Sequence, residues 1–128
     1  MNIPLDKPKH NKSFIAYHIT WIPKYRRKIL KGPNAEYCKE LIINKSLELN
    51  INLCEIEVMP DHIHIFIKVK ASVAVSKIIG ILKGYSSFML RKKYSKCRYT
   101  AHLWTGSYFC ESIGKVNEKT IRKYIQNQ

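Results

Sequence analysis

The sequence predicts an α+β fold in which helices cover one face of an antiparallel sheet and a further helix ends the chain. Three observations support this prediction. The chain has 128 residues, of which 45% are hydrophobic, and this suffices for one packed core. Segments of alternating apolar residues, typical of strands, are interrupted by segments with apolar residues at helical spacing. We expect one domain over residues 13–128 and a flexible polar arm over residues 1–12.

The first half of the domain reads as strand, helix and strand. Residues 13–22 are rich in β-branched and aromatic types, which favours a strand that ends at Pro23. A helix begins at Pro33, since proline suits the first turn, and apolar residues at helical spacing carry it to about residue 50. The strand expected at 51–58 alternates. One of its faces carries Glu55 and Glu57, and the other carries Cys54, Ile56 and Val58.

The second half repeats the pattern after a turn at 59–61. A strand at 62–70 has the clearest alternation in the chain, and an amphipathic helix is expected at 73–93. A strand rich in aromatics follows at 103–110, and Asn117 is a suitable N-cap for a last helix over 117–128. The order β-α-β-β-α-β is that of the split βαβ, or ferredoxin-like, plan.

Positive charge is the strongest global feature of the sequence. The net charge is +14, from 23 basic and 9 acidic residues, and no acidic residue lies between His62 and Cys110. Basic residues cluster at 24–31 and at 91–98. Phosphate backbones are the usual partners of such surfaces, although an anionic membrane or no partner at all would also suit a basic protein. No apolar run is long enough to span a bilayer and the N-terminus lacks a signal-peptide pattern, so we expect a cytoplasmic protein.

The four cysteines are spaced too widely for a Cys-x-x-Cys metal pair. In a cytoplasmic chain, cysteines without such a pattern behave as small apolar residues and are commonly buried. We therefore expect no metal or redox role for them. They are Cys38, Cys54, Cys97 and Cys110.

Two histidines on the strand at 62–70 are candidate metal ligands. Side chains two residues apart on a strand point the same way, with Cα atoms roughly 6.5–7 Å apart, so His62 and His64 can converge on one ion. A structural pair remains the alternative, but aliphatic residues on the opposite face already serve the core. Asp61 precedes the pair and could be a metal ligand, a partner of a ligand or a turn residue.

The last predicted helix carries a second candidate pair, Tyr124 and Gln128. Their spacing of four residues places both side chains on nearly one helix face. Taken alone, a tyrosine on an amphipathic helix is more often a core or interface residue than a catalytic one.

Five short motifs, in this order, resemble those of the single-tyrosine HUH transposases, the TnpA-type enzymes of the smallest bacterial and archaeal insertion sequences. The strand PDHIHIF at 60–66 resembles the histidine–hydrophobic–histidine (HUH) motif of that family. The other motifs are HITWIPKYR at 18–26, LKGYSS at 82–87, LWTGSYF at 103–109 and YIQNQ at 124–128. The similarity runs from about Phe14 to the last residue.

The resemblance implies a set of roles for these residues. Tyr124 matches the nucleophile, which forms a 5′-phosphotyrosine, and His62, His64 and Gln128 match the ligands of a divalent ion, Mg²⁺ or Mn²⁺. It also implies a homodimer that shares active sites between subunits and binds single-stranded DNA hairpins at element ends. Interleaved aromatic and basic residues suit stacking and phosphate contacts with such DNA. These are Lys24, Tyr25, Arg26, Arg27, Lys83 and Tyr85.

Other functions remain open at this point. A non-catalytic single-stranded DNA- or RNA-binding module on the same ferredoxin-like plan would explain the charge and the aromatics. It would give no reason for the paired histidines or for Tyr124 and Gln128. An inactive, domesticated transposase would keep the fold without the reaction. Replication initiators and relaxases share the chemistry but are usually longer.

Overall fold

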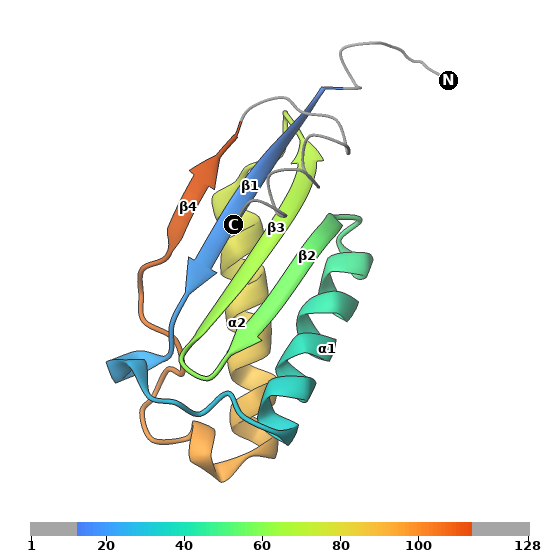
Figure 1. The fold of residues 1–128 in the computed structure, drawn as a ribbon. Coiled ribbons are helices and arrows are strands. Elements are labelled where there is room, and N and C mark those ends of the chain that lie inside the picture. Colours follow the sequence, from blue (N-terminus) through green and yellow to red (C-terminus); the bar gives the residue numbers. More distant parts are fainter. Residues whose placement is uncertain (1–12, 114–128) are drawn as a thin grey trace.

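A four-stranded antiparallel sheet with two helices packed on one face makes up the computed structural model, which describes residues 13–113 (Figure 1). The strand order is β2-β3-β1-β4, as expected for the split βαβ plan. The elements are β1 (Phe14–Trp21), α1 (Pro33–Glu48), β2 (Asn52–Met59), β3 (His62–Lys70), α2 (Val75–Lys93) and β4 (Phe109–Ser112). Short 3-10 turns lie at Lys24–Arg26 and Ser95–Cys97.

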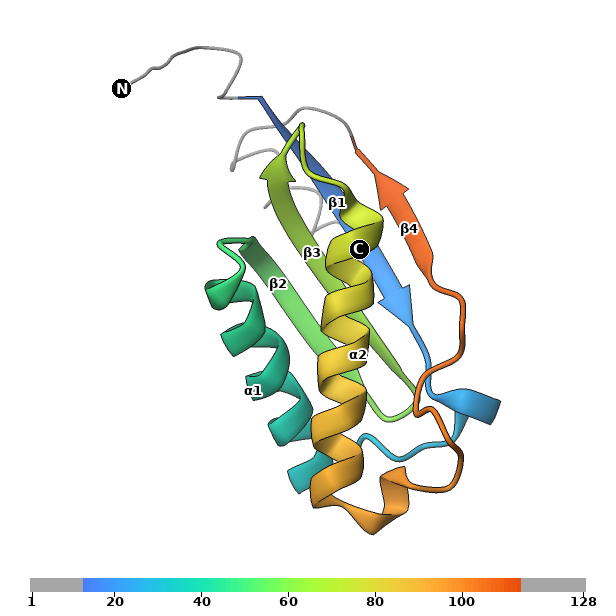
Figure 2. The same ribbon diagram turned by 180° about the vertical axis from the view of Figure 1, so that it is seen from behind.

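The central strands β1 and β3 form the base of the core. They pair antiparallel from Phe14 opposite Lys70 to Trp21 opposite Ile63. Figure 2 shows α1 and α2 lying over one face of these strands. The aliphatic side chains that β1 and β3 contribute to the main core are fully or almost fully buried. Each such side chain contributes roughly 1.5–3 kcal/mol through burial. Because strand side chains alternate, the histidines of β1 and β3 point away from the helices.

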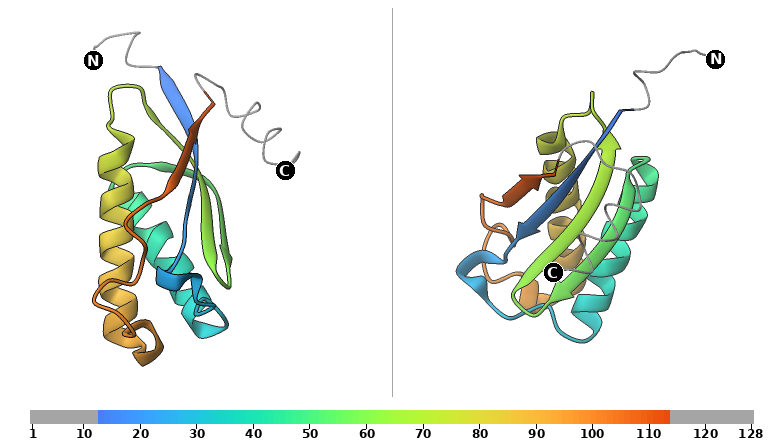
Figure 3. Two further views of the ribbon diagram at one scale, coloured as in Figure 1. Left: turned by 90° about the vertical axis from the view of Figure 1, so that its left-hand side faces the viewer. Right: turned by 45° about the horizontal axis from the view of Figure 1, so that its top comes forward.

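Both helices bury the stripe that the sequence predicted. In α1 the buried residues are Cys38, Leu41, Ile42 and Ser46, and in α2 they are Ile78, Ile79, Leu82, Ser86 and Leu90. Figure 3 shows α1 and α2 on the same side of the sheet. The opposite sheet face is thus left without a described helix. Among the described residues, no helix is both long enough and apolar enough to cross a membrane.

A β-bulge in β2 places the Cys54 side chain on the sheet face opposite to the predicted one. The pairing register with β3 shifts between Leu53 and Glu55, so one residue of β2 is left over. Cys54 therefore packs with Ala16 and Phe66 on the histidine face, rather than with the side chains that face the helices. The prediction that Cys54 shares a face with its neighbours at 56 and 58 was wrong.

The strand predicted at 103–110 begins later than expected. Only Phe109–Ser112 forms β4, and Trp104 makes one isolated bridge to Pro23. Leu103 and Trp104 are buried in the main core, where the indole Nε1–H of Trp104 donates to Ser86 Oγ at 3.0 Å. At Trp104 the aromatic signal thus reflects core packing rather than strand pairing, whereas Tyr108 and Phe109 are exposed. The predicted arm at 1–12 and the helix predicted at 117–128 lie outside the described residues.

Candidate active site

His62 and His64 lie side by side on β3, on the face away from the helices, as predicted. Their side chains are 24% and 30% exposed, and their ring centroids are 5.1 Å apart at an interplanar angle of 61°. A metal–nitrogen bond of about 2.1 Å places an ion about 3.3 Å from each ring centroid, so two rings on one ion are roughly 4.7–5.4 Å apart. The observed separation of 5.1 Å falls in this range.

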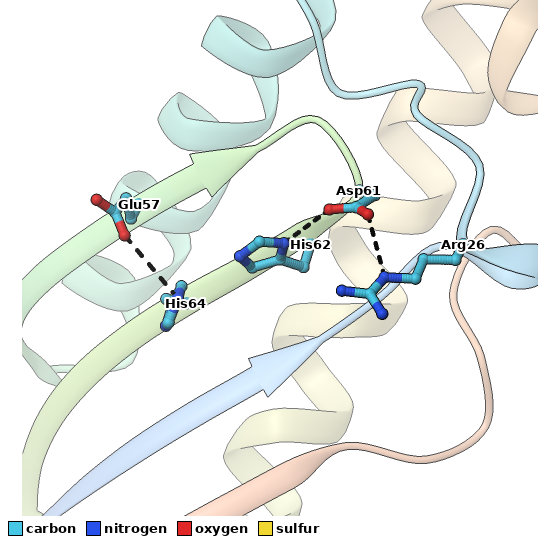
Figure 4. Close-up of polar contacts among 5 residues, drawn as sticks. All are labelled: Arg26, Glu57, Asp61, His62 and His64. Atoms are coloured by element: carbon cyan, nitrogen blue, oxygen red, sulfur yellow. Dashed lines mark hydrogen bonds and ion pairs between the residues drawn. The ribbon is translucent and has the colours of Figure 1, made fainter. Parts of the chain in front are cut away.

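The Nδ1 atom of His62 is held by a carboxylate. It lies 2.8 Å from Asp61 Oδ1, and Asp61 Oδ2 accepts a hydrogen bond from Arg26 Nε at 3.1 Å (Figure 4). The hydrogen bond from His62, followed by the charge of Arg26, lowers the pKa of Asp61. An ionised Asp61 favours the proton on His62 Nδ1 and leaves Nε2 as the donor for a metal. Asp61 thus lies in the turn between β2 and β3, as one of its three predicted roles requires, and its contact with His62 is also compatible with the role of a partner to a ligand.

His64 has a different set of neighbours. Its Nδ1 lies 2.9 Å from Nε2 of His18 on β1, and its Nε2 lies 3.9 Å from Oε1 of Glu57 on β2. Burial and the neighbouring His62 lower the pKa of His64, although Glu57 opposes this effect. At neutral pH this favours the neutral imidazole, which is the form that binds metals. The carboxylate of Glu57 adds negative charge beside Nε2, as Figure 4 shows.

The described residues supply two ligands of the predicted metal set. Within residues 13–113 there is no group of three or more His, Cys, Asp or Glu side chains placed to hold an ion. The predicted third ligand Gln128 and the predicted nucleophile Tyr124 lie outside the described residues. Two imidazoles that are oriented through Nδ1 are suitable donors for a divalent transition ion.

A basic cleft lies at the end of the molecule where β1 leads into α1. Its volume is about 930 Å³, and none of its lining residues is acidic. It is lined by Arg27, Lys28, Ile29, Lys31, Pro33, Asn34, Tyr94, Ser95, Lys96 and Tyr99. The Arg27 guanidinium lies 4.5 Å from the centre of the Tyr99 ring. The cleft thus brings the two basic clusters of the sequence together.

The turn at Lys24–Arg26, just before the cleft, has an unusual backbone. Tyr25 and Arg26 both have positive φ angles, 60° and 52°, which cost energy for residues with a Cβ. Tyr25 is 80% exposed, whereas Arg26 points to Asp61. Of the predicted DNA-binding residues, Arg27 thus lines the cleft and Arg26 contacts Asp61 beside the histidine pair. Lys24 and Tyr25 lie in the turn that precedes them.

The other two predicted DNA-binding residues lie on α2. The Lys83 ammonium group donates to the carbonyl oxygens of Thr105 and Ser107, at 2.8 and 3.0 Å, and burial lowers the pKa of Lys83. The Tyr85 ring lies 4.2 Å below the Lys45 ammonium group and packs against the core. Both residues thus have contacts within the protein.

None of the four cysteines, all of which lie in the described part of the chain, forms a disulfide. Cys38 and Cys97 are buried, whereas Cys54 and Cys110 are half-buried. Burial raises the pKa of Cys38 to about 12 and also raises the pKa values of Cys97 and Cys110. Such thiols remain protonated near neutral pH and do not react as nucleophiles.

Two residues of the site were not among the sequence-based candidates. His18 was placed in the strand predicted at 13–22 and in the motif HITWIPKYR, without a role in the site, and Glu57 was assigned only to a strand face. The alternation of side chains along each strand placed both residues on the histidine face. Their contacts with His64, however, depend on how β1 and β2 pair with β3. That register is not encoded in any single segment.

The fold and the site define a class of protein: a split βαβ sheet that carries a histidine–hydrophobic–histidine strand next to a basic cleft. A family model described as "Transposase IS200 like" matches residues 11–128. The chain therefore belongs to the IS200-like transposase family. This confirms the resemblance that the five motifs indicated.

Individual relatives agree with this assignment. The chain is 30% identical over 122 residues to a Salmonella typhimurium protein named "Transposase for insertion sequence element IS200", covering 93% of this chain and 80% of that protein. It is 27% identical over 117 residues to "ISDra2 transposase TnpA" of Deinococcus radiodurans, covering 89% and 84%.

Solved structures share the fold. A crystal structure from Deinococcus radiodurans R1, described as a candidate transposase, aligns with a TM-score of 0.74 at 24% identity, covering 90% of this chain and 91% of that one. A REP-associated tyrosine transposase bound to a REP hairpin aligns with a TM-score of 0.65 at 15% identity, covering 87% and 62%.

Proposed function

We propose that the protein cleaves and rejoins single-stranded DNA at insertion-sequence ends, with Tyr124 as the nucleophile and a divalent ion held by His62, His64 and Gln128. The observation that carries this proposal is the histidine pair on β3, whose rings are 5.1 Å apart and whose Nδ1 atoms are both engaged. A buried structural pair has no need of this arrangement. The ion, Mg²⁺ or Mn²⁺, would offset charge on the phosphodiester and stabilise the leaving oxygen.

The proposed cleavage exchanges one ester for another. The Tyr124 oxygen bonds to phosphorus, the bond between phosphorus and the 3′ oxygen breaks, and the 3′ oxygen leaves as a hydroxyl after it takes up a proton. The phenolic proton passes to solvent. Attack by the 3′-hydroxyl of a second strand reverses the exchange and releases Tyr124. Joining needs no ATP because the phosphotyrosine conserves the bond energy.

The proposed DNA is a hairpin with single-stranded flanks. One structural neighbour is bound to a REP hairpin, which supports this class of substrate. The basic cleft offers four cationic side chains and two tyrosines for phosphate contacts and stacking. The cations are Arg27, Lys28, Lys31 and Lys96. Such binding should weaken steeply as the salt concentration rises, since bound counterions are released on association.

We further propose a cytoplasmic homodimer whose subunits share active sites. Family membership supports this assembly. An equilibrium sedimentation experiment on the full chain would measure the oligomeric state directly. A purely monomeric protein that still forms the covalent adduct would contradict the shared-site part of the proposal.

A covalent-capture experiment tests the reaction. The protein is incubated with single-stranded element ends and Mn²⁺, and the products are separated on a denaturing gel. Wild-type protein should give a covalent protein–DNA band, and Tyr124→Phe should bind the hairpin but give no band. Tyr17→Phe is the matched control, because Tyr17 packs against the hydrophobic core on the helix side of β1 and does not line the basic cleft.

The outcomes separate the two classes of function. An adduct formed by Tyr124→Phe would refute the assigned nucleophile. Hairpin binding by the wild-type protein without any adduct, in Mg²⁺ or Mn²⁺, would identify a non-catalytic binding module instead.

A further inference from the structure

We infer that His18 is a positioning residue for the proposed metal site, because its ring fixes the tautomer and the orientation of His64. This inference rests on the proposed metal binding by His64.

The contact between the two rings has the geometry of an in-plane hydrogen bond. His18 Nε2 and His64 Nδ1 are 2.9 Å apart, the ring planes differ by only 7°, and the centroids are 5.1 Å apart. Each ring nitrogen lies about 1.2 Å from its centroid, so two rings joined edge to edge at this distance would have centroids about 5.3 Å apart. The rings thus lie nearly in one plane, with N–H and lone pair along the line between the nitrogens.

Only one proton can lie on this line, and its position determines which nitrogen of His64 can bind a metal. A neutral imidazole has one N–H and one lone pair. If Nδ1 of His64 carries the proton and donates it to His18 Nε2, the lone pair of His64 is on Nε2, the atom that faces Glu57 and the prospective ion. His18 is then the acceptor and carries its own proton on Nδ1.

The sheet holds His18 in place from both sides. β1 pairs with β3 on one side and with β4 on the other, so the backbone at His18 lies opposite Phe66 and Glu111. The His18 ring contacts the rings of Phe66 and Phe109, with centroid separations of 6.1 and 6.3 Å. An acceptor held on a central strand is rigid, as a residue that orients a ligand needs to be.

The two ligands are oriented by unlike partners. His62 is held by the Asp61 carboxylate, which is charged and adjacent in sequence, whereas His64 is held by a ring from another strand. Each partner can therefore be removed without touching the other.

Metal titration with matched variants tests this role. Mn²⁺ binding to the full chain is measured by electron paramagnetic resonance without DNA, so that the readout does not depend on cleavage. His18→Phe keeps a ring for packing but cannot accept a hydrogen bond, and it should weaken Mn²⁺ binding about 10- to 100-fold. His18→Gln places an amide oxygen within reach of His64 and should restore affinity to within about threefold of wild type.

Controls distinguish positioning from packing. His102→Phe removes an exposed histidine outside the sheet and should leave Mn²⁺ binding unchanged. Circular dichroism and thermal melting establish that each variant is folded. If His18→Phe does not fold, the imidazole nitrogen resonances of Mg²⁺-loaded wild-type protein give the same answer, since His64 should carry its proton on Nδ1.

Three results would overturn the inference. They are wild-type Mn²⁺ affinity in folded His18→Phe, equal losses in the Phe and Gln variants, or a proton on Nε2 of metal-loaded His64. Failure of the proposed metal site itself would look different, because His62→Ala would then bind Mn²⁺ as tightly as wild type does.

Discussion

Replacing Lys83 by methionine tests whether this residue binds DNA or stabilises the loop before β4. Its ammonium group donates one half-buried hydrogen bond to the Thr105 carbonyl and one exposed bond to the Ser107 carbonyl. A hydrogen bond from a charged donor contributes about 1.5–3 kcal/mol when sheltered from water and less when exposed, so the pair contributes about 2–3 kcal/mol. Methionine retains the apolar stem but leaves both carbonyls without this donor.

We expect Lys83→Met to lower the free energy of unfolding by about 2–3 kcal/mol, or the melting temperature by roughly 4 °C per kcal/mol. The slope of log hairpin affinity against log salt concentration should equal that of wild type, because the Lys83 ammonium group is bonded to carbonyls inside the protein. The matched control is Lys96→Met, which removes an exposed cation from the cleft. It should leave stability unchanged and reduce the slope of log affinity against log salt by about 0.7–0.9. The opposite pattern, an unchanged melting temperature with a reduced slope in Lys83→Met, would refute this reasoning.

Three further changes have defined expectations. The raised pKa of Cys38 implies that the contribution of this thiol to stability is constant below pH 9.0, its ordinary pKa, and falls by up to about 1.4 kcal/mol per pH unit between pH 9 and about 12. Urea unfolding across this range should show a steeper fall in stability for wild type than for Cys38→Ala. Asp61→Asn should weaken Mn²⁺ binding about 10- to 100-fold while hairpin binding changes little, and equal loss of both would indicate a structural role. Tyr25→Gly should relieve the strain of a positive φ of 60° and stabilise the fold by up to about 1 kcal/mol in thermal melts. The same change should weaken hairpin binding if the exposed ring stacks on a base, and unchanged affinity would exclude stacking.

Local periodicity was sufficient to predict most of the fold. The alternation in 62–70 identified β3, both of its faces and the histidine pair, because the period of two requires no knowledge of other strands. The two helices were predicted from apolar spacing, and proline at the start of α1 marked its first turn. For β3, α1 and α2, the signal carried by the segment itself was sufficient, and the sequence-based prediction was confirmed.

The errors arose where the outcome depended on distant residues. A bulge moved Cys54 to the other face of β2, and no composition signal at 51–58 indicates an extra residue there. Trp104 carried a strand-like signal, but its indole is satisfied by Ser86 on α2, and it packs against Trp21 with ring centroids 6.1 Å apart. A loop with buried aromatic residues can have the same composition and the same spacing of apolar residues as a strand. The sequence pattern alone therefore does not distinguish the two.

The strained turn before the cleft links the two halves of the candidate site. Two consecutive residues with positive φ cost roughly 1–2 kcal/mol each and persist only if the surroundings hold them. Here the Arg26 backbone N–H donates to the Pro23 carbonyl at 2.8 Å, and the Arg26 side chain bonds to Asp61, which holds His62. Asp61 therefore contacts both the strained turn, through Arg26, and the histidine pair, through His62. The strained residues therefore lie where the basic segment 24–31 meets the histidine pair. A change that relieves the strain should alter the candidate site more than the packing of the core.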